Sequence, residues 1–207
     1  QLINTPLAGG GTLRLEFEGL ASARDAAVLV RTTNGGAGVA YPGIPLGEAL
    51  RGTSVIGWLR EDARDRTNLA LVNAGAVEDG DVALRVTLTS TDPASQGRSV
   101  TLPDVILHPG GFFQTNRVLS ASGLGSVTAV ARIERLSGQA PYLAYAVVND
   151  EITSDGSIVF AQAPPDVTAA GGLVVPAVVE TGAYETELLL TNVSASPRRL
   201  RLEYVAE

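Results

Sequence analysis

The chain lacks cysteine, methionine and lysine, and it contains a single histidine. Without cysteine there is no disulfide framework, so stability has to come from packing and strand pairing. The one histidine, His108, stands directly before Pro109 and is predicted to be a turn residue. Zinc and iron sites need clusters of histidine or cysteine, which this composition cannot supply. The sequence therefore argues against histidine-based catalysis and against such metal sites.

Other absences limit the class of protein. A net charge of −7 argues against binding of nucleic acid, which needs a basic face. No run of about 18 apolar residues is present, so no membrane span is expected. Hydrophobic residues make up 45% and charged residues 18% of the 207 residues, which favours packed cores over disorder. The length suits one large or two ordinary domains.

The composition and the first residue favour life outside the cell. The sequence begins at Gln1 with neither an initiator methionine nor a basic and apolar leader, as expected of a mature protein after removal of a signal peptide. The absence of cysteine and methionine leaves little for oxidation to damage. We therefore expect an extracellular or cell-surface protein.

Alternating apolar and polar residues are the main structural pattern. Strict alternation occurs in residues 12–18, 84–88 and 200–204, and this period places one face of a strand in a core and the other in water. Residues 46–50 offer at most one helical turn. A dozen or more short segments bounded by glycine, proline, aspartate and serine predict an all-β, antiparallel β-sandwich.

Two junctions rich in glycine, proline and alanine divide the chain into pieces. The predicted organisation is one complete sandwich between two complementary half-domains: a back half at 1–42, a linker at 43–52, the complete β-sandwich domain at 53–163, a linker at 164–171 and a front half at 172–207.

Internal sequence matches are the reason for this division. Residues 186–192 (TELLLTN) repeat residues 67–73 (TNLALVN), and residues 7–13 (LAGGGTL) parallel residues 107–113 (LHPGGFF). Two shorter matches follow in the same order: 28–31 with 129–132, and 39–41 with 143–145. The chain therefore looks like a repeat unit divided within a domain, which suggests head-to-tail assembly.

The middle piece carries motifs of a known kind of domain. Residues 66–75 read Arg-Thr-Asn, an apolar strand and Asn-Ala-Gly; a Leu-Pro strand at 102–103 precedes a Gly-Gly turn at 110–111; and an Ala-Tyr-Ala strand ends in Asn-Asp at 144–150. This pattern resembles the uncharacterised, loosely immunoglobulin-like tandem β-sandwich repeats of secreted bacterial surface proteins. The resemblance implies a structural or adhesive role without known catalytic residues.

Few residues suggest chemistry. Asp150 and Asp155, with the neighbouring Asn149 and Glu151, offer oxygen ligands that suit Ca²⁺, but a solvated hairpin turn is the favoured interpretation. The mixed charges of residues 60–66 are typical of a self-paired, solvated loop. We expect no enzymatic activity, no bound metal and no cofactor.

Two further residues have an ordinary structural interpretation beside a functional one. Trp58 could stack on a sugar, but a single tryptophan at the start of a sandwich is expected in the core. Asn192 begins an N-glycosylation pattern, and its match to Asn73 favours a turn after a strand.

An isolated half-sandwich would leave one apolar face and its strand edges exposed. The halves could be covered by pairing between successive chains, by pairing within one chain, or by further repeats of a longer protein. The first alternative is favoured. The side chains expected at such a subunit interface are Leu13, Leu15, Phe17, Val28, Val30, Leu188, Leu190, Leu200, Leu202 and Tyr204.

The sequence thus predicts the structural subunit of an extracellular filament or surface fibre. The partner is a second copy of the chain, and the polymer grows by exchange of strands or half-domains. The alternative is a carbohydrate- or surface-binding module that uses the loops at 60–66 and 149–156. A filament predicts mass that rises with concentration, whereas a binding module predicts a discrete species.

Overall fold

The structure, a computed structural model, describes residues 12–22, 25–35 and 37–164, and in the C-terminal part residues 178, 179, 181, 186–190, 192, 199, 201 and 203. The chain divides into two compact units, Gln1–Ala163 and Pro164–Glu207. The first unit contains the strands and helical turns described below.

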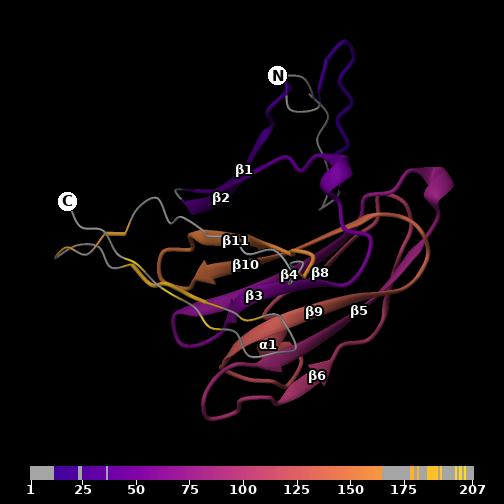
Figure 1. Cartoon of the computed structure of the whole chain (residues 1–207). Helices are drawn as coiled ribbons and strands as arrows, with labels where there is room; N and C mark the ends of the chain where they lie inside the picture. Colours follow the sequence, from indigo (N-terminus) through magenta and orange to yellow (C-terminus); the bar gives the residue numbers. More distant parts are fainter. Residues whose placement is uncertain are drawn as a thin grey trace. The chain divides into compact units, whose positions relative to one another are not determined.

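The fold is nearly all β, and every strand pair is antiparallel, which confirms the predicted fold class (Figure 1). The strands are β1 (Leu29–Asn34), β2 (Ala37–Pro42), β3 (Ser54–Arg60), β4 (Asp65–Asn73), β5 (Val82–Ser90), β6 (Ser99–Thr101), β7 (Val105–Leu107), β8 (Phe112–Thr115), β9 (Thr128–Ser137), β10 (Tyr142–Asp150) and β11 (Gly156–Phe160).

Two of the three sheets form the sandwich. One has the order β11-β10-β4-β8, and the other has the order β3-β9-β5-β6, with β7 also pairing with β5. The alternation expected at 84–88 is confirmed in β5, where Leu84, Val86 and Leu88 are buried and the residues between them are partly exposed. Leu69 and Leu71 of β4 are completely buried in the same core. The hydrophobic faces of the two sheets therefore pack on each other.

The described residues contain a short α-helix that the sequence pattern did not predict. This helix, α1 (Val118–Ala121), follows Arg117, which has a left-handed backbone with φ of 49°. The carboxylate of Glu61 accepts the backbone N–H groups of Leu119 and Ser120, each at 3.0 Å, and also the Ser120 hydroxyl. Glu61 is 3% exposed, so its assignment to a solvated loop was wrong: it satisfies the N–H groups at the start of the helix.

Two short 3₁₀ turns follow the ribbon and β4: η2 (Leu46–Glu48), within the segment for which one turn was predicted, and η3 (Val77–Asp79). Among these residues no helix has the length and apolar character needed to cross a bilayer.

Trp58 lies at an irregularity of β3 and not in the core. Its φ is 58°, and the pairing of β3 with β9 shifts register between Ile56 and Leu59. The extra residue of this bulge interrupts the pairing of β3 with β9. The Trp58 side chain therefore does not follow the inward and outward alternation of the strand. The side chain is only partly buried, which corrects the expectation of a core tryptophan.

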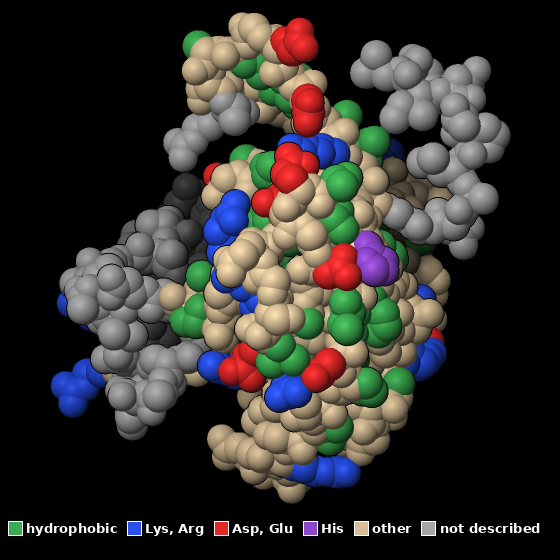
Figure 2. Space-filling model, turned by 90° about the vertical axis from the view of Figure 1, so that its right-hand side faces the viewer, with side chains coloured by type: hydrophobic (Ala, Val, Ile, Leu, Met, Phe, Trp, Pro, Cys, Tyr) green, Lys and Arg blue, Asp and Glu red, His purple; other side chains and the backbone are tan. Residues whose placement is uncertain are grey.

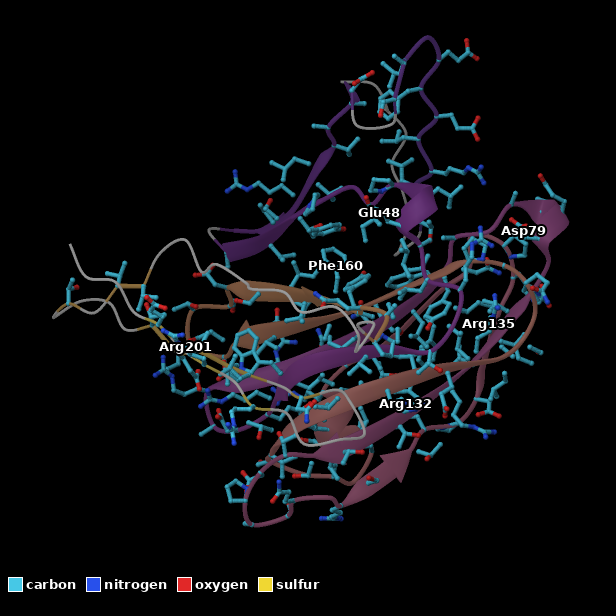
Figure 3. The ribbon with its side chains drawn as sticks, viewed as in Figure 1. Glu48, Asp79, Arg132, Arg135, Phe160 and Arg201 are labelled. Atoms are coloured by element: carbon cyan, nitrogen blue, oxygen red, sulfur yellow. The ribbon has the colours of Figure 1, made fainter. Side chains whose placement is uncertain are left out.

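The third sheet is a two-stranded ribbon of β1 and β2 that lies over the outer face of β10 and β11 (Figure 1). The Tyr41 ring stacks on Tyr145 with centroids 6.4 Å apart and meets Phe160 edge-on at 6.3 Å. Phe160 lies between β11 and the ribbon (Figure 3). Aromatic pairs of this kind contribute about 0.5–1.5 kcal/mol beyond the area they bury. The ribbon is thus attached to the sandwich through aromatic side chains.

Two segments expected to be strands are not strands here. Residues 12–17 and 186–190 have no strand pairing, although their alternation or their match to β4 predicts it. A strand needs a neighbour for its backbone N–H and C=O groups, and no strand of the described residues pairs with either segment. The segment 200–204 falls mostly outside the described residues.

Candidate functional site

A groove in the first unit brings five of the predicted interface residues together. Its volume is about 620 Å³, and its wall includes residues 12–17 and the side chains of Val28 and Val30. Residues 73–75 and Leu143 form part of the opposite wall. The segments that the sequence assigns to the back half therefore share one cavity beside the sandwich.

The N-terminal part of this wall is apolar and open to solvent. Leu13, Leu15 and Phe17 are 60%, 46% and 54% exposed. Val28 and Val30 are partly buried. The Val28 carbonyl accepts the N–H of Gly43 at 2.8 Å, which fixes the base of the ribbon. Exposed leucine and phenylalanine side chains gathered at one groove are typical of a surface that another chain covers.

The described candidates of the C-terminal unit are also exposed. Leu188 and Leu190 are 49% and 57% exposed. Leu200, Leu202 and Tyr204 lie outside the described residues. The predicted interface therefore has an exposed apolar part in each unit of the chain.

A hydrogen-bond pattern of the sandwich recurs in the C-terminal unit. At the corner from β3 to β4, the Thr67 hydroxyl accepts the N–H of Arg60 at 2.9 Å and donates to the carbonyl of the same residue at 2.6 Å. The Thr186 hydroxyl makes the same two bonds with Val179, both at 2.9 Å. The two residues are seven positions apart in each case. The match of 186–192 to 67–73 thus extends to local structure.

Asp150, the calcium candidate, is the last residue of β10 and holds the turn that follows it. Its Oδ1 atom accepts the N–H groups of Ile152 and Thr153 at 2.7 and 2.8 Å, and its own N–H donates to the Asp155 carbonyl at 2.9 Å. The hydrogen bonds from these two N–H groups hold the pKa of the Asp150 carboxyl below its usual value, and the bond from Thr153 has the larger effect. The described residues contain no group of three side chains that could hold a metal ion. Asp150 therefore stabilises the hairpin between β10 and β11.

The two loops at 60–66 and 149–156 lie against each other. The N–H of Glu151 donates to the Arg64 carbonyl at 2.6 Å. The Glu151 carboxylate accepts Arg66 and Arg117, each at 2.8 Å. Arg64 and Asp150 form a longer pair at 3.5 Å. The opposite charges of the two loops therefore pair with each other across a short distance.

Within the first loop, Asp62 organises the turn between β3 and β4. Its carboxylate accepts the N–H groups of Arg64 and Asp65 and the Arg60 side chain. The bond from the Arg64 N–H is the main reason that the pKa of Asp62 is lowered. Burial instead raises the pKa of Asp65. The predicted self-pairing therefore holds for Arg60 with Asp62 and Asp65, whereas Arg64 and Arg66 pair with the loop at 149–156.

His108 takes part in a surface turn, as the sequence predicts. Its carbonyl accepts the N–H of Gly111 at 2.7 Å, and its Nδ1 atom lies 2.7 Å from Oδ1 of Asp81. Figure 2 shows the histidine beside an acidic side chain on an open surface. The histidine side chain is 82% exposed, so it is not set in a cleft where it could act on a substrate.

The sequence pattern does not predict the aromatic contact of Tyr41 with Tyr145 and Phe160. One signal was available: Tyr41 and Tyr145 occupy matching positions in the repeated triplets VAY and LAY. That match suggested equivalent positions in two domains. It did not suggest that the two rings touch.

Comparisons with known proteins give no family. No protein-family model matches the chain, and no curated protein matches it. A solved structure described as the crystal structure of Thermotoga maritima 1070 is similar to this chain with 12% sequence identity and a TM-score of 0.40, over 54% of this chain and 93% of that chain.

Proposed function

We propose that this protein is the structural subunit of an extracellular filament. Copies join head to tail, and the C-terminal front half of one copy completes the N-terminal back half of the next. The contact joins two different surfaces, so it is heterologous and can continue along a fibre. No catalysis, metal or cofactor is part of this function.

The observation that carries the proposal is the repeated threonine hydrogen-bond pattern. Thr67 closes the corner from β3 to β4 on Arg60, and Thr186 makes the same two hydrogen bonds with Val179, seven residues before it. The residues that follow each threonine have opposite environments. Leu69 and Leu71 are completely buried, whereas the matching Leu188 and Leu190 are 49% and 57% exposed. The C-terminal unit therefore repeats a local hydrogen-bond pattern of the sandwich, and the leucines that follow this pattern are exposed.

Four exposed leucines occupy positions that match strands β8 and β4 of the sandwich: Leu13, Leu15, Leu188 and Leu190. Burying one such side chain contributes roughly 1.5–3 kcal/mol, and the four are already about half buried. Covering them therefore contributes on the order of several kcal/mol before the cost of association. Backbone pairing of the two segments would add main-chain hydrogen bonds between the copies.

Sedimentation velocity over a range of concentrations, with negative-stain electron microscopy, tests the proposal. The expected result is a mass that rises with concentration, together with fibres. Leu190→Asp should abolish assembly while leaving the melting of the middle sandwich unchanged, because a charge on the buried face opposes burial there alone. Val77→Asp is the control, since Val77 is 85% exposed in the turn η3. Compact monomers at every concentration would overturn the filament.

A circular permutant separates pairing between chains from pairing within one chain. It begins near residue 171, continues from residue 207 through a short linker into residue 1, and ends near residue 170. If the halves pair between chains, the permutant places them at high effective concentration and should be a monomer, while the natural order remains a polymer. If both orders are monomeric near 21.4 kDa, the halves close within one chain.

The second candidate is a carbohydrate- or surface-binding module. One observation favours it: the loops at 60–66 and 149–156, far apart in sequence, contact each other through Arg66 and Glu151. This function predicts a monomer whose melting temperature rises in the presence of a glycan. The same sedimentation experiment therefore distinguishes the two candidates.

A further inference from the structure

We infer that residues 186–190 of one copy pair as an antiparallel strand with residues 12–15 of another copy, with Leu188 opposite Leu15 and Leu190 opposite Leu13. This inference rests on the proposed function and deepens it, because it names the two segments in contact and their register. Four steps lead to it.

The first step is the pairing of β4 with β8 in the complete sandwich. These strands are antiparallel, with Leu69 opposite Thr115 and Leu71 opposite Phe113. Ala70 stands opposite Gln114. Leu69 and Leu71 face the core, and Phe113 packs against the same core. This pair of strands is therefore the template for the contact.

The second step places residues 186–190 at the positions of β4. TELLLTN matches TNLALVN from the threonine onwards. Thr186 and Thr67 make the same hydrogen bonds, so the two threonines occupy equivalent positions. An alignment shifted by one residue would no longer place them at the same position. Leu188 therefore takes the position of Leu69, and Leu190 takes the position of Leu71.

The third step places residues 12–15 at the positions of β8. In the sandwich, Gly110 has a φ of 72° and Gly111 closes a tight turn on the His108 carbonyl, directly before β8. Residues 7–13 reproduce this order with glycine at positions 10 and 11. Leu13 then takes the position of Phe113, and Leu15 takes the position of Thr115.

The fourth step is the agreement of the two alignments with the faces of a strand. Arg14 falls at the position of Gln114, which is exposed, while the leucines on either side fall at partly buried positions. All four leucines then lie on one face of the new strand pair. A slip by one residue would turn one pair of leucines to the opposite face. Leu189 is also exposed and lies beside Arg14 on the other face, so the register rests on the two alignments together with the faces of the leucines.

A second copy is the partner that these observations favour. The segment that fits beside residues 12–15 belongs to this chain, and its three leucines, Leu188, Leu189 and Leu190, are exposed. Leu13 and Leu15 line the groove beside the sandwich, so the incoming strand has an apolar wall to cover. The contact is a strand addition, in which main-chain hydrogen bonds join the copies and the leucines determine the register.

Disulfide formation between single-cysteine variants tests the register, and the chain has no cysteine of its own to interfere. Leu15→Cys and Leu188→Cys are prepared as separate full-length chains, mixed and oxidised. Opposite residues in an antiparallel pair have Cβ atoms about 4.5–5.5 Å apart, within reach of a disulfide. The expected result is a covalent dimer on a non-reducing gel. Leu13→Cys mixed with Leu188→Cys, displaced by two residues, should give no such dimer.

A second mixture guards against loss of a buried leucine. Arg14→Cys and Leu189→Cys lie on the opposite face of the proposed strand pair, and they leave all four leucines in place. A dimer from this mixture supports the register. If the chains assemble but only displaced pairs of cysteines crosslink, the proposed register is wrong and the filament proposal still stands.

Absence of assembly has a separate consequence. If the unsubstituted chain is a monomer at all concentrations, the filament fails. The proposed contact between copies is then wrong as well. This remains true even if a single chain that carries both Leu15→Cys and Leu188→Cys forms an internal disulfide. That internal bond would assign the same register to pairing within one chain. If no mixture and no doubly substituted chain crosslinks, the register itself is wrong.

Discussion

The hydroxyl oxygens of Ser54 and Tyr142 lie 2.9 Å apart in the core and join β3 of one sheet to β10 of the other. The Tyr142 hydroxyl also donates to the Gly52 carbonyl at 2.7 Å. Burial raises the pKa of Tyr142, so its hydroxyl stays protonated near neutral pH. Both hydroxyl groups are thus used inside the sandwich, where an unsatisfied polar group would be costly.

Removing this link should destabilise the sandwich. Tyr142→Phe leaves the Gly52 carbonyl and the Ser54 hydroxyl without their partner, so we expect the free energy of unfolding to fall by about 1–3 kcal/mol. Urea denaturation measures it, and a double-mutant cycle with Ser54→Ala isolates the coupling. Tyr145→Phe on the outer face is the control and should cost less. Equal losses for the two tyrosines would contradict this account.

Matching leucines should respond differently to truncation. Leu71→Ala leaves a cavity in a filled core and should cost about 2–5 kcal/mol in the free energy of unfolding. Leu190→Ala should leave the melting of dilute protein almost unchanged, because Leu190 is half exposed there. At concentrations that favour assembly, it should instead reduce polymer mass. Thermal melting and sedimentation on the same samples measure both effects.

Glu61→Gln tests the carboxylate that holds α1. An amide supplies one acceptor oxygen in place of two, so one of the N–H groups of Leu119 and Ser120 loses its partner. We expect a loss of about 1–3 kcal/mol in the free energy of unfolding. Glu78→Gln, at an exposed position of η3, should change stability by less than about 0.5 kcal/mol. A similar loss for both variants would mean that Glu61 has no special role in stability.

Asp150 should make the stability depend on pH in the acid range. Its pKa in the folded protein is below the unfolded value of 3.8, so its contribution is complete above that pH and is lost as pH falls through the folded pKa. Asp150→Asn should therefore be less stable than the unsubstituted chain at pH 7, and the difference should narrow below pH 3.8. Urea midpoints over this range measure the difference. A constant difference would show that the charge is irrelevant.

Gly138 and Gly123 form a matched pair of glycine positions. Both have positive φ, 86° and 82°, where an L side chain costs roughly 1–2 kcal/mol. A Cβ at Gly123 meets nothing within 4 Å, whereas one at Gly138 would lie 2.1 Å from the Asp81 carbonyl oxygen. Gly138→Ala should therefore lower the melting temperature considerably more than Gly123→Ala. Equal effects would mean that the clash relaxes without cost.

The parts of the fold that follow from local pattern were predictable. The alternation at 84–88 identifies β5 and its buried leucines because period two determines which side chains face a core. The turn at His108 follows from the Pro-Gly-Gly sequence after it. At the groove, the alternation of residues 12–17 places apolar side chains at every second position, and Leu13 and Leu15 are exposed there; their part in an interface stays a prediction.

The parts that depend on distant partners were not predictable. Helix α1 has four residues and begins at a left-handed Arg117, and its N–H groups are satisfied by Glu61 from another part of the chain. No local signal marks such a helix. The position of Trp58 was not predictable either, because no local signal marks the bulge in β3 that takes its side chain out of the core. Residues 12–17 alternate like a strand, but a strand forms only where a neighbour is present.

The link between Ser54 and Tyr142 spans 88 positions of sequence. Neither sheet can be completed before β9 and β10 are available, since β3 pairs with β9 and β4 pairs with β10. Such long-range closure is entropically expensive early in folding, and domains of this kind typically fold in about milliseconds to seconds. During synthesis, β3 to β8 must therefore wait for the last strands, with their apolar faces uncovered.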